Sequence, residues 1–106
     1  MKDERRRSVR IKKALEIIYS SSSPPIHARL EDLSETGMFV ETSHPLEQGA
    51  MIEFTLVLPD ENMSTPVKGK GEVSWTDQVG AGVRFTSISD EDRERIKWYV
   101  AEVFFG

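Results

Sequence analysis

The sequence predicts a mainly β protein, a small antiparallel barrel followed by one C-terminal helix. Three observations predict this fold. The chain has 106 residues, which is enough for one hydrophobic core and too few for two. Short runs of alternating apolar and polar residues follow one another, with turn-forming residues between them. Near residue 89 this pattern gives way to a segment of helical periodicity.

The first two strands are expected on either side of a loop rich in serine and proline. Residues 14–19 form a β-branched and aromatic run, which ends at the serines and prolines of residues 20–25. Residues 26–31 then alternate between apolar and polar side chains, as in a strand with one buried face. The alternation breaks at residues 32–37, where we expect a turn or a bulge.

Four further strands are expected before the helix, and glycine, proline or acidic residues separate them. Their ranges are 38–41, 52–58, 67–76 and 81–86. In the third of these four, Trp75 shares a face with Val67 and Val73. We therefore expect its side chain in the barrel core or at the lip of the barrel, with stacking on a ligand as the alternative.

A helix is expected over residues 89–105. Ser89 can cap its first turn, and the three acidic residues that follow suit the positive end of the helix dipole. Apolar residues at helical spacing form one stripe for docking on the barrel. The stripe consists of Ile96, Tyr99, Val100, Val103 and Phe104. Trp98 and Phe105 fall outside it, and either form a partner or dimer surface or pack against the barrel.

Charge is unevenly distributed along the chain. The net charge is -4, but residues 1–13 hold seven Lys or Arg against two acids, and the remainder holds seven against sixteen. A basic arm on an acidic body predicts a local anionic ligand rather than a broad nucleic-acid surface. The chain accordingly divides into a flexible basic arm, residues 1–13, and a single barrel with its helix, residues 14–106.

Several classes of protein are disfavoured by composition. The chain has no cysteine, so disulfides are excluded, and the composition suits a reducing cytoplasm. The N-terminus is charged and no apolar run approaches the roughly 18 residues of a membrane span, so we expect no membrane insertion. His27 and His44 stand apart, so no metal or cofactor is expected. No nucleophile elbow or phosphate-binding glycine loop is present, and we predict no enzyme and no catalytic residue.

Two short motifs carry the candidate chemistry. Arg6 and Arg10 form an Arg-x-x-x-Arg motif inside an arginine-rich segment. Asp32, Ser34 and Gly37 form an Asp-x-Ser-x-x-Gly motif at the break between the second and third expected strands. The simplest structural interpretation of the second motif is an Asx-type turn, which is compatible with a role in binding.

Both motifs match the signature of the PilZ domain family, and the chain resembles that family over nearly its whole length. Residues 71–75, Gly-Glu-Val-Ser-Trp, and residues 82–85, Gly-Val-Arg-Phe, extend the resemblance towards the acidic helix start. One departure is Met38, where many members of the family have a second glycine.

The resemblance implies a six-stranded antiparallel barrel whose N-terminal arginines wrap onto a bound cyclic di-GMP. This ligand offers two anionic phosphates and two guanines, which a planar guanidinium can meet by paired hydrogen bonds or by stacking. Arg6 and Arg10 suit that demand. Arg5 and Arg7 add more charge than one ligand molecule requires, and would suit a stacked pair of them.

The second motif can be matched to the same ligand. The carboxylate of Asp32 can accept from guanine N–H groups, or it can hold one of the arginines. Ser34 offers a short hydroxyl to a phosphate or a base. Gly37 permits a positive φ or a close approach of the ligand to the backbone.

We expect a receptor whose basic arm becomes ordered around cyclic di-GMP and creates a surface that a protein partner recognises. The resemblance points to partners in motility, exopolysaccharide or biofilm control. The alternative is a PilZ-like adaptor that binds only proteins. A third possibility, a single-strand-binding barrel, would need exposed aromatic residues on a strand face, and the expected outer faces are mainly charged, so neither DNA nor RNA is expected as a partner.

Overall fold

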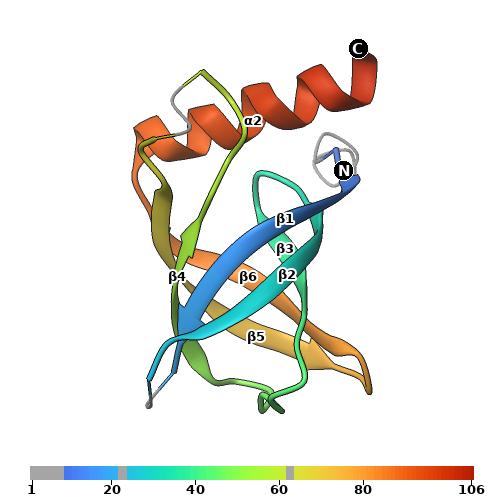
Figure 1. Cartoon of the computed structure of the whole chain (residues 1–106), viewed down its shortest axis with the longest axis vertical. Coiled ribbons are helices and arrows are strands. Elements are labelled where there is room, and N and C mark those ends of the chain that lie inside the picture. The colour runs from blue at the N-terminus through green and yellow to red at the C-terminus, as the bar shows by residue number, and fades with distance from the viewer. Residues whose placement is uncertain (1–8, 22–23, 62–63) are drawn as a thin grey trace, which may run out of the picture.

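The computed structural model describes residues 9–21, 24–61 and 64–106, and its elements follow one another as six strands and one helix (Figure 1). The predicted arginines Arg5, Arg6 and Arg7 lie outside the described residues. The elements are β1 (Ile11–Ser20), β2 (Ile26–Leu33), β3 (Gly37–Glu41), β4 (Met51–Leu56), β5 (Val67–Thr76), β6 (Gly80–Ile88) and α2 (Asp90–Phe105).

The strands form a closed barrel in the order β1-β2-β3-β6-β5-β4, and every neighbouring pair is antiparallel. Closure leaves no free sheet edge, which would otherwise be a template for aggregation. Figure 1 shows α2 lying across one end of this barrel. The predicted fold class, a six-stranded antiparallel barrel with a C-terminal helix, is confirmed.

The core fills the barrel with side chains from alternate positions of each strand. In β1 the inward positions include Ile17 and Tyr19, each 1% exposed, and in β2 Leu30 is fully buried. Each such aliphatic or aromatic side chain contributes roughly 1.5–3 kcal/mol by leaving water. Alternation of apolar residues is therefore both the pattern in the sequence and the main source of stability.

The helix starts and ends as the sequence predicts. The backbone N–H of Asp92 donates to the hydroxyl of Ser89 over 3.1 Å, which is an N-cap bond, and Gly106 caps the other end. Ile96, Tyr99 and Val100 are buried, which closes this end of the barrel.

The predicted apolar stripe was wrong at its end, because Phe104 is 56% exposed. The barrel covers the helix fully only as far as Val100, while Val103 is partly buried. Trp98 and Phe105 are 71% and 76% exposed, so their alternative burial against the barrel is also wrong.

The first strand begins three residues earlier than predicted. Ile11 is 5% exposed and pairs with Leu33, so residues 11–13, which the sequence assigned to the arm, belong to β1. A register shift between Lys12 and Leu15 explains the error, because it interrupts the alternation that marks a strand. The residues that precede the barrel are therefore fewer, and Arg10 lies directly before its first strand.

Candidate functional site

The turn between β2 and β3 is built around the side chain of Ser34, which is 1% exposed. Its hydroxyl accepts from the backbone N–H groups of Thr36 and Gly37, each over 3.2 Å. The backbone N–H of Ser34 also donates to the carbonyl of Gly37 over 2.9 Å. Ser34 is thus a structural residue of the turn, as expected for a serine that satisfies backbone donors locally.

A bulge turns Asp32 to the outside of the barrel. With strict alternation after the buried Leu30, residue 32 would point inward. The register shifts between Leu30 and Asp32, so Glu31 and Asp32 both lie outward and Leu33 returns to the core. The carboxylate can therefore reach ligands in solution while the strand keeps its buried face.

Arg10 connects the two motifs in space. Its guanidinium forms an ion pair with the carboxylate of Asp32, and its second terminal nitrogen lies 3.4 Å from the hydroxyl of Ser34. The side chain of Arg10 is 47% exposed and that of Asp32 is 22% exposed. Such an exposed pair contributes little to stability, so both groups can change partners at low cost.

Gly37 has a packing role that the sequence did not reveal. Its φ is not positive, since Gly49 is the one described residue with a positive φ. A Cβ at Gly37 would lie 2.5 Å from the carbonyl oxygen of Val83 on β6. The glycine therefore lets β3 approach β6 closely, next to the turn.

The opposite wall of the site is aromatic. The expected place of Trp75 in the barrel core is wrong, while its alternative role in stacking on a ligand stays a prediction. The register of β5 shifts between Val73 and Trp75, so the indole lies outside the barrel and is 49% exposed. It covers the backbone of Gly82, where a Cβ would lie 2.2 Å from the indole nitrogen. The ring of Phe39 stacks on it at a centroid distance of 5.3 Å.

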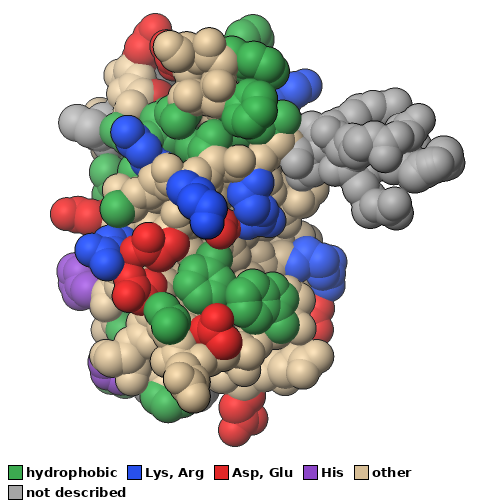
Figure 2. Space-filling view, turned by 90° about the vertical axis from the view of Figure 1, so that its right-hand side faces the viewer, with side chains coloured by type: hydrophobic (Ala, Val, Ile, Leu, Met, Phe, Trp, Pro, Cys, Tyr) green, Lys and Arg blue, Asp and Glu red, His purple; other side chains and the backbone are tan. Residues whose placement is uncertain are grey.

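The two walls enclose a hollow of about 400 Å³ on the outer surface of the barrel. Its lining residues are Arg10, Asp32, Thr36, Gly37, Met38, Phe39, Ser74, Trp75, Gly82, Val83 and Arg84. Figure 2 shows a face of the molecule on which apolar side chains lie beside basic and acidic ones. Two guanidinium groups, a carboxylate and an exposed indole match a ligand that is both anionic and aromatic.

The charges of Arg84, inside the hollow, and Arg29, outside it, are each balanced by glutamates. Arg84 lines the hollow and pairs with Glu72 over 2.6 Å, with 59% of its side chain exposed. Arg29 bonds to both Glu41 and Glu31, over 2.7 and 2.6 Å, and its bond to Glu41 is the main reason why the pKa of the Glu41 carboxyl is lowered. Two carboxylates already bind Arg29, which lies outside the hollow, so it is a poor candidate for ligand binding.

Comparison with known proteins identifies the family. The family model described as PilZ domain matches residues 4–102. The chain belongs to the PilZ domain family. The predicted resemblance is confirmed, and PilZ domains are ligand-binding or adaptor domains, usually receptors for cyclic di-GMP, rather than enzymes. No protein with a curated description matches the chain.

Solved structures share the fold, and two of those described here are PilZ domains. The structure of the Bacillus subtilis inhibitor of motility MotI/DgrA superposes with a TM-score of 0.82 at 15% identity over 92% of this chain, which spans only 50% of the Bacillus protein. The PilZ domain of YcgR from Escherichia coli, in a structure with c-di-GMP, gives a TM-score of 0.70 at 16% identity over 95% of this chain and 92% of that one. The PilZ domain of CeSA from a cellulose-synthesizing bacterium gives 0.63 at 19% identity, over 92% and 95% of the two chains.

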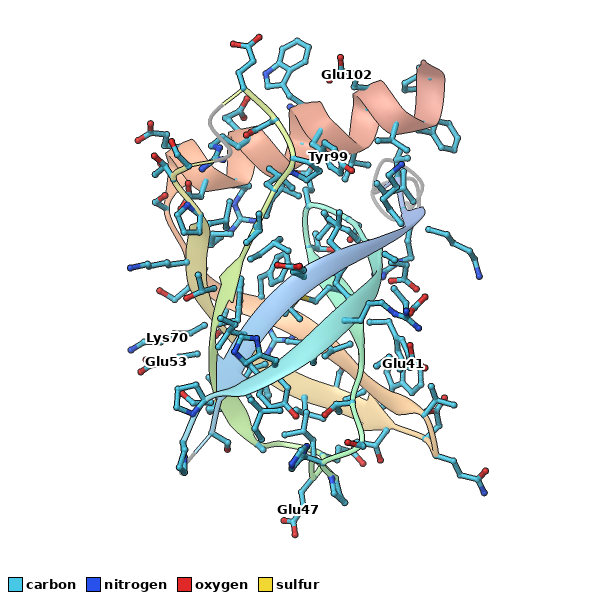
Figure 3. The ribbon with its side chains drawn as sticks, in the orientation of Figure 1. Glu41, Glu47, Glu53, Lys70, Tyr99 and Glu102 are labelled. Atoms are coloured by element: carbon cyan, nitrogen blue, oxygen red, sulfur yellow. The ribbon has the colours of Figure 1, made fainter. Side chains whose placement is uncertain are left out.

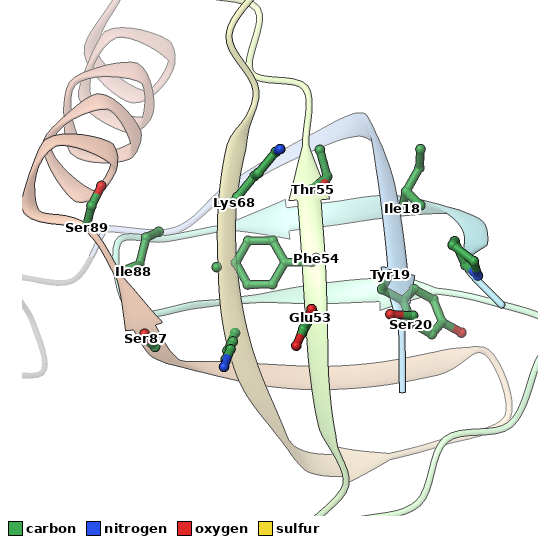
Figure 4. A pocket seen from close by; sticks show the side chains of 13 residues that line it. Ile18, Tyr19, Ser20, Glu53, Phe54, Thr55, Lys68, Ser87, Ile88 and Ser89 are labelled. Atoms are coloured by element: carbon green, nitrogen blue, oxygen red, sulfur yellow. The ribbon is translucent and has the colours of Figure 1, made fainter. Parts of the chain in front are cut away.

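A second hollow of this PilZ domain, about 490 Å³ in volume, lies over β1, β4, β5 and β6 (Figure 4). The ring of Phe54 forms its floor, because Gly69 has no side chain to cover it. Lys68 and Lys70 flank it, but neither signature motif contributes a residue. This hollow lacks the paired guanidinium and carboxylate groups of the first one.

Within the described residues, no group of three or more His, Asp or Glu side chains is arranged to hold a metal ion. In the same part of the chain, no helix is both long and apolar enough to cross a membrane. The sequence identified Arg10, Asp32, Ser34 and Gly37, which do lie together. It offered Trp75 only as an alternative stacking residue, and it missed Phe39 and Arg84. The sequence signal for the outward indole is Gly82, which pairs with Trp75 in the neighbouring strand and leaves room for the ring.

Proposed function

We propose that the protein is a receptor for cyclic di-GMP, which binds in the hollow between the β2–β3 turn and Trp75. The supporting observation is the contact of Arg10 with both Asp32 and Ser34. It unites two motifs that are 22 to 24 residues apart in the sequence into one polar wall, opposite an exposed aromatic wall.

The chemistry of the hollow suits each part of this ligand. A guanine can stack on the indole of Trp75, which is worth about 1–3 kcal/mol per base in comparable sites. The carboxylate of Asp32 can accept from the guanine N1–H and N2–H groups, and the guanidinium of Arg10 can bond to O6 and N7 or to a phosphate. Arg84 supplies a second cation on the side of β6.

Ligand binding would replace the present pairing of Arg10 with Asp32. Both groups are exposed enough for the exchange to be inexpensive. Arg5, Arg6 and Arg7, which precede the described residues, would close over the phosphates from the arm. In this proposal the ordered arm forms the surface that an effector protein recognises in the cytoplasm, in motility, exopolysaccharide or biofilm control. No enzymatic step is involved.

Isothermal titration calorimetry of the purified chain with cyclic di-GMP tests this proposal, with GTP and cyclic di-AMP as competitors for specificity. We expect selective binding that Arg10→Ala or Asp32→Ala weakens at least about tenfold, because a charge-assisted hydrogen bond is worth about 1.5–3 kcal/mol. Arg10→Lys should also weaken binding, since an ammonium keeps the charge and loses the planar fork.

Arg29→Ala is the matched control, because it removes an exposed arginine that two glutamates already bind outside the hollow. Its affinity for the nucleotide should equal that of the wild type. No heat at tens-of-micromolar concentrations, or an equal loss in Arg29→Ala and Arg10→Ala, would refute the receptor and favour an adaptor that binds only proteins. Thermal unfolding of each variant shows whether it is folded.

A further inference from the structure

The outer edge of α2 and the segment after β4 form a groove of about 980 Å³. It shares no lining residue with the hollow proposed for the nucleotide. Its walls are Pro59, Asp60 and Glu61 on one side and Arg95, Trp98, Tyr99, Ala101, Glu102 and Phe105 on the other. Figure 2 shows apolar side chains gathered at the end of the molecule that α2 covers.

The base of the groove is held by Arg95. Its guanidinium donates to both carboxylate oxygens of Asp60, over 3.0 and 2.9 Å, and to the carbonyl of Thr65 over 2.7 Å. The side chain of Arg95 is only 11% exposed, and the hydrogen bond that it donates to Asp60 raises its pKa. A bidentate pair in this position fixes the helix to the segment after β4, so the groove exists before any partner binds.

The apolar lining of the groove is open to solvent. Trp98 and Phe105 are 71% and 76% exposed, the highest values among the exposed large apolar side chains of the described residues. Tyr99, which is buried, also lines the groove. Large aromatic side chains that remain exposed on one surface mark sites of protein association.

The charges around the groove determine which partner it fits. Glu61 and Glu102 are exposed at its rim, and the last turn of α2 has no basic residue. Arg95 is the basic residue of the lining, and Asp60 already neutralises it. A second copy of this chain would present the same acidic rim, and an anionic membrane surface would also be repelled, so charge complementarity favours a cationic partner.

We propose that this groove is the docking site for a short amphipathic segment of a partner protein that carries lysines or arginines beside its apolar residues. Trp98, Glu102 and Phe105 follow i, i+4, i+7 spacing, so they lie on one face of α2. An apolar side chain of the partner inserts between the two aromatic rings, and its cationic side chains pair with the glutamates at the rim.

This inference deepens the proposed function, since it names the surface through which a nucleotide-bound state can be recognised. The groove itself does not depend on the proposed function, but its regulation by nucleotide does. A physical link exists, because Arg93 of α2 donates to the carbonyl of Glu35, in the turn of the nucleotide site, over 3.1 Å. Val9, one residue before Arg10, lines a small hollow with Glu35, Lys97 and Val100. The helix therefore lies beside residues that adjoin both motifs of the proposed nucleotide site.

The test uses a synthetic peptide of leucine and lysine, about 18 residues long, designed as an amphipathic helix, and a second peptide with glutamate in place of lysine. The chain has two tryptophans, Trp75 in the nucleotide hollow and Trp98 in the groove, whose indole N–H signals separate in a ¹H–¹⁵N spectrum. We expect the lysine peptide to shift the signal of Trp98 and not that of Trp75, and the glutamate peptide to shift neither.

Fluorescence anisotropy of the labelled lysine peptide gives affinities for variants. Trp98→Ala and Glu102→Lys should each weaken binding about tenfold. The matched controls are Val79→Ala, an apolar side chain 50% exposed in the β5–β6 turn, and Glu47→Lys, at the end of the barrel opposite Glu102 (Figure 3). Both should bind like the wild type.

Three results would overturn the proposal. One is equal weakening by Glu47→Lys and Glu102→Lys, which would mean binding by net charge alone. The second is a dimer in sedimentation that Trp98→Ala dissociates, which would make a second copy the occupant. The third is binding to anionic vesicles that Trp98→Ala abolishes. Peptide binding without nucleotide binding would remove the proposed receptor function and leave the groove standing.

Discussion

The turn of residues 32–37 and the outer edge of α2 are two candidate contact surfaces built on opposite principles. In the turn, polar groups are already bonded to one another: Ser34 to two backbone N–H groups, and Asp32 to Arg10. On the edge of α2, Trp98 and Phe105 expose most of their surface to water. The turn has polar partners to exchange, and the helix has apolar surface to cover.

This difference shows how each surface should behave when it is mutated. A bonded turn supports the barrel as well as the ligand, so changes at its buried members should cost stability. An uncovered helix edge supports nothing in the isolated chain, so changes there should cost only binding. Buried and exposed positions of the two surfaces should therefore differ in their effect on stability.

Neighbouring positions of α2 should give the largest contrast in stability. Ile96→Ala removes a side chain with 0% exposure and should lower the free energy of unfolding by about 2–5 kcal/mol. Trp98→Ala removes a side chain that is 71% exposed and should change it by less than about 0.5 kcal/mol. Urea unfolding measures both. A large loss in Trp98→Ala would mean that the exposed edge is part of the core.

Gly37→Ala should destabilise the turn by about 1–3 kcal/mol, because the added methyl group would meet the carbonyl oxygen of Val83 at 2.5 Å. Gly49→Ala is the control, in which a loss of stability has a different cause. It meets no atom within 4 Å, but its φ of 92° is unfavourable for alanine, which should cost about 1 kcal/mol. A loss at Gly37 that is smaller than the loss at Gly49 would contradict the close approach of β3 and β6.

Ser34→Ala should cost about 1–2 kcal/mol, since the backbone N–H groups of Thr36 and Gly37 would lose a buried acceptor. Ser74→Ala is the matched control, because the Ser74 hydroxyl donates to the carbonyl of Gly82 at an exposed position. It should change stability by less than about 0.5 kcal/mol. Chemical unfolding of the two variants side by side decides whether the hydroxyl of Ser34 organises the turn.

The smallest effect concerns alkaline pH. Burial raises the pKa of Tyr99, so the folded chain holds this phenolic proton more tightly than the unfolded chain does. The stability that results is complete below about pH 10 and is lost as the pH rises above that value towards the folded pKa. Tyr99→Phe should therefore lose less stability than the wild type between about pH 8 and pH 11 in thermal unfolding scans. Parallel losses would contradict the burial of this hydroxyl.

Most of the fold followed from alternation in the sequence, because inward and outward side chains of a barrel strand differ in polarity. Alternation gives the wrong side-chain direction or strand start at bulges. At β5, a register shift between Val73 and Trp75 turns the indole outward, whereas strict alternation would put it on the face of Val73. At β1, a register shift between Lys12 and Leu15 hides the first residues of the strand, so the sequence predicts its start after Ile11. A bulge depends on the partner strand, which a local pattern does not reveal.

The site was predictable where a motif names its residues. Arg10, Asp32 and Ser34 form contacts that bring the two motifs together, but Phe39 and Arg84 reach the hollow only through the pairing of β3 with β6. Phe104 shows the corresponding limit for the helix, because periodicity marks an apolar face and not how far the barrel extends beneath it.

A ¹H–¹⁵N spectrum of the chain titrated with cyclic di-GMP tests whether the nucleotide binds between the β2–β3 turn and Trp75. We expect the indole signal of Trp75 and the backbone signals of Thr36 and Gly37 to shift together, with one affinity, while the signals of Lys68 and Lys70 in the second hollow stay in place. Shifts confined to the second hollow, or an unchanged spectrum at saturating nucleotide, would contradict binding at this position.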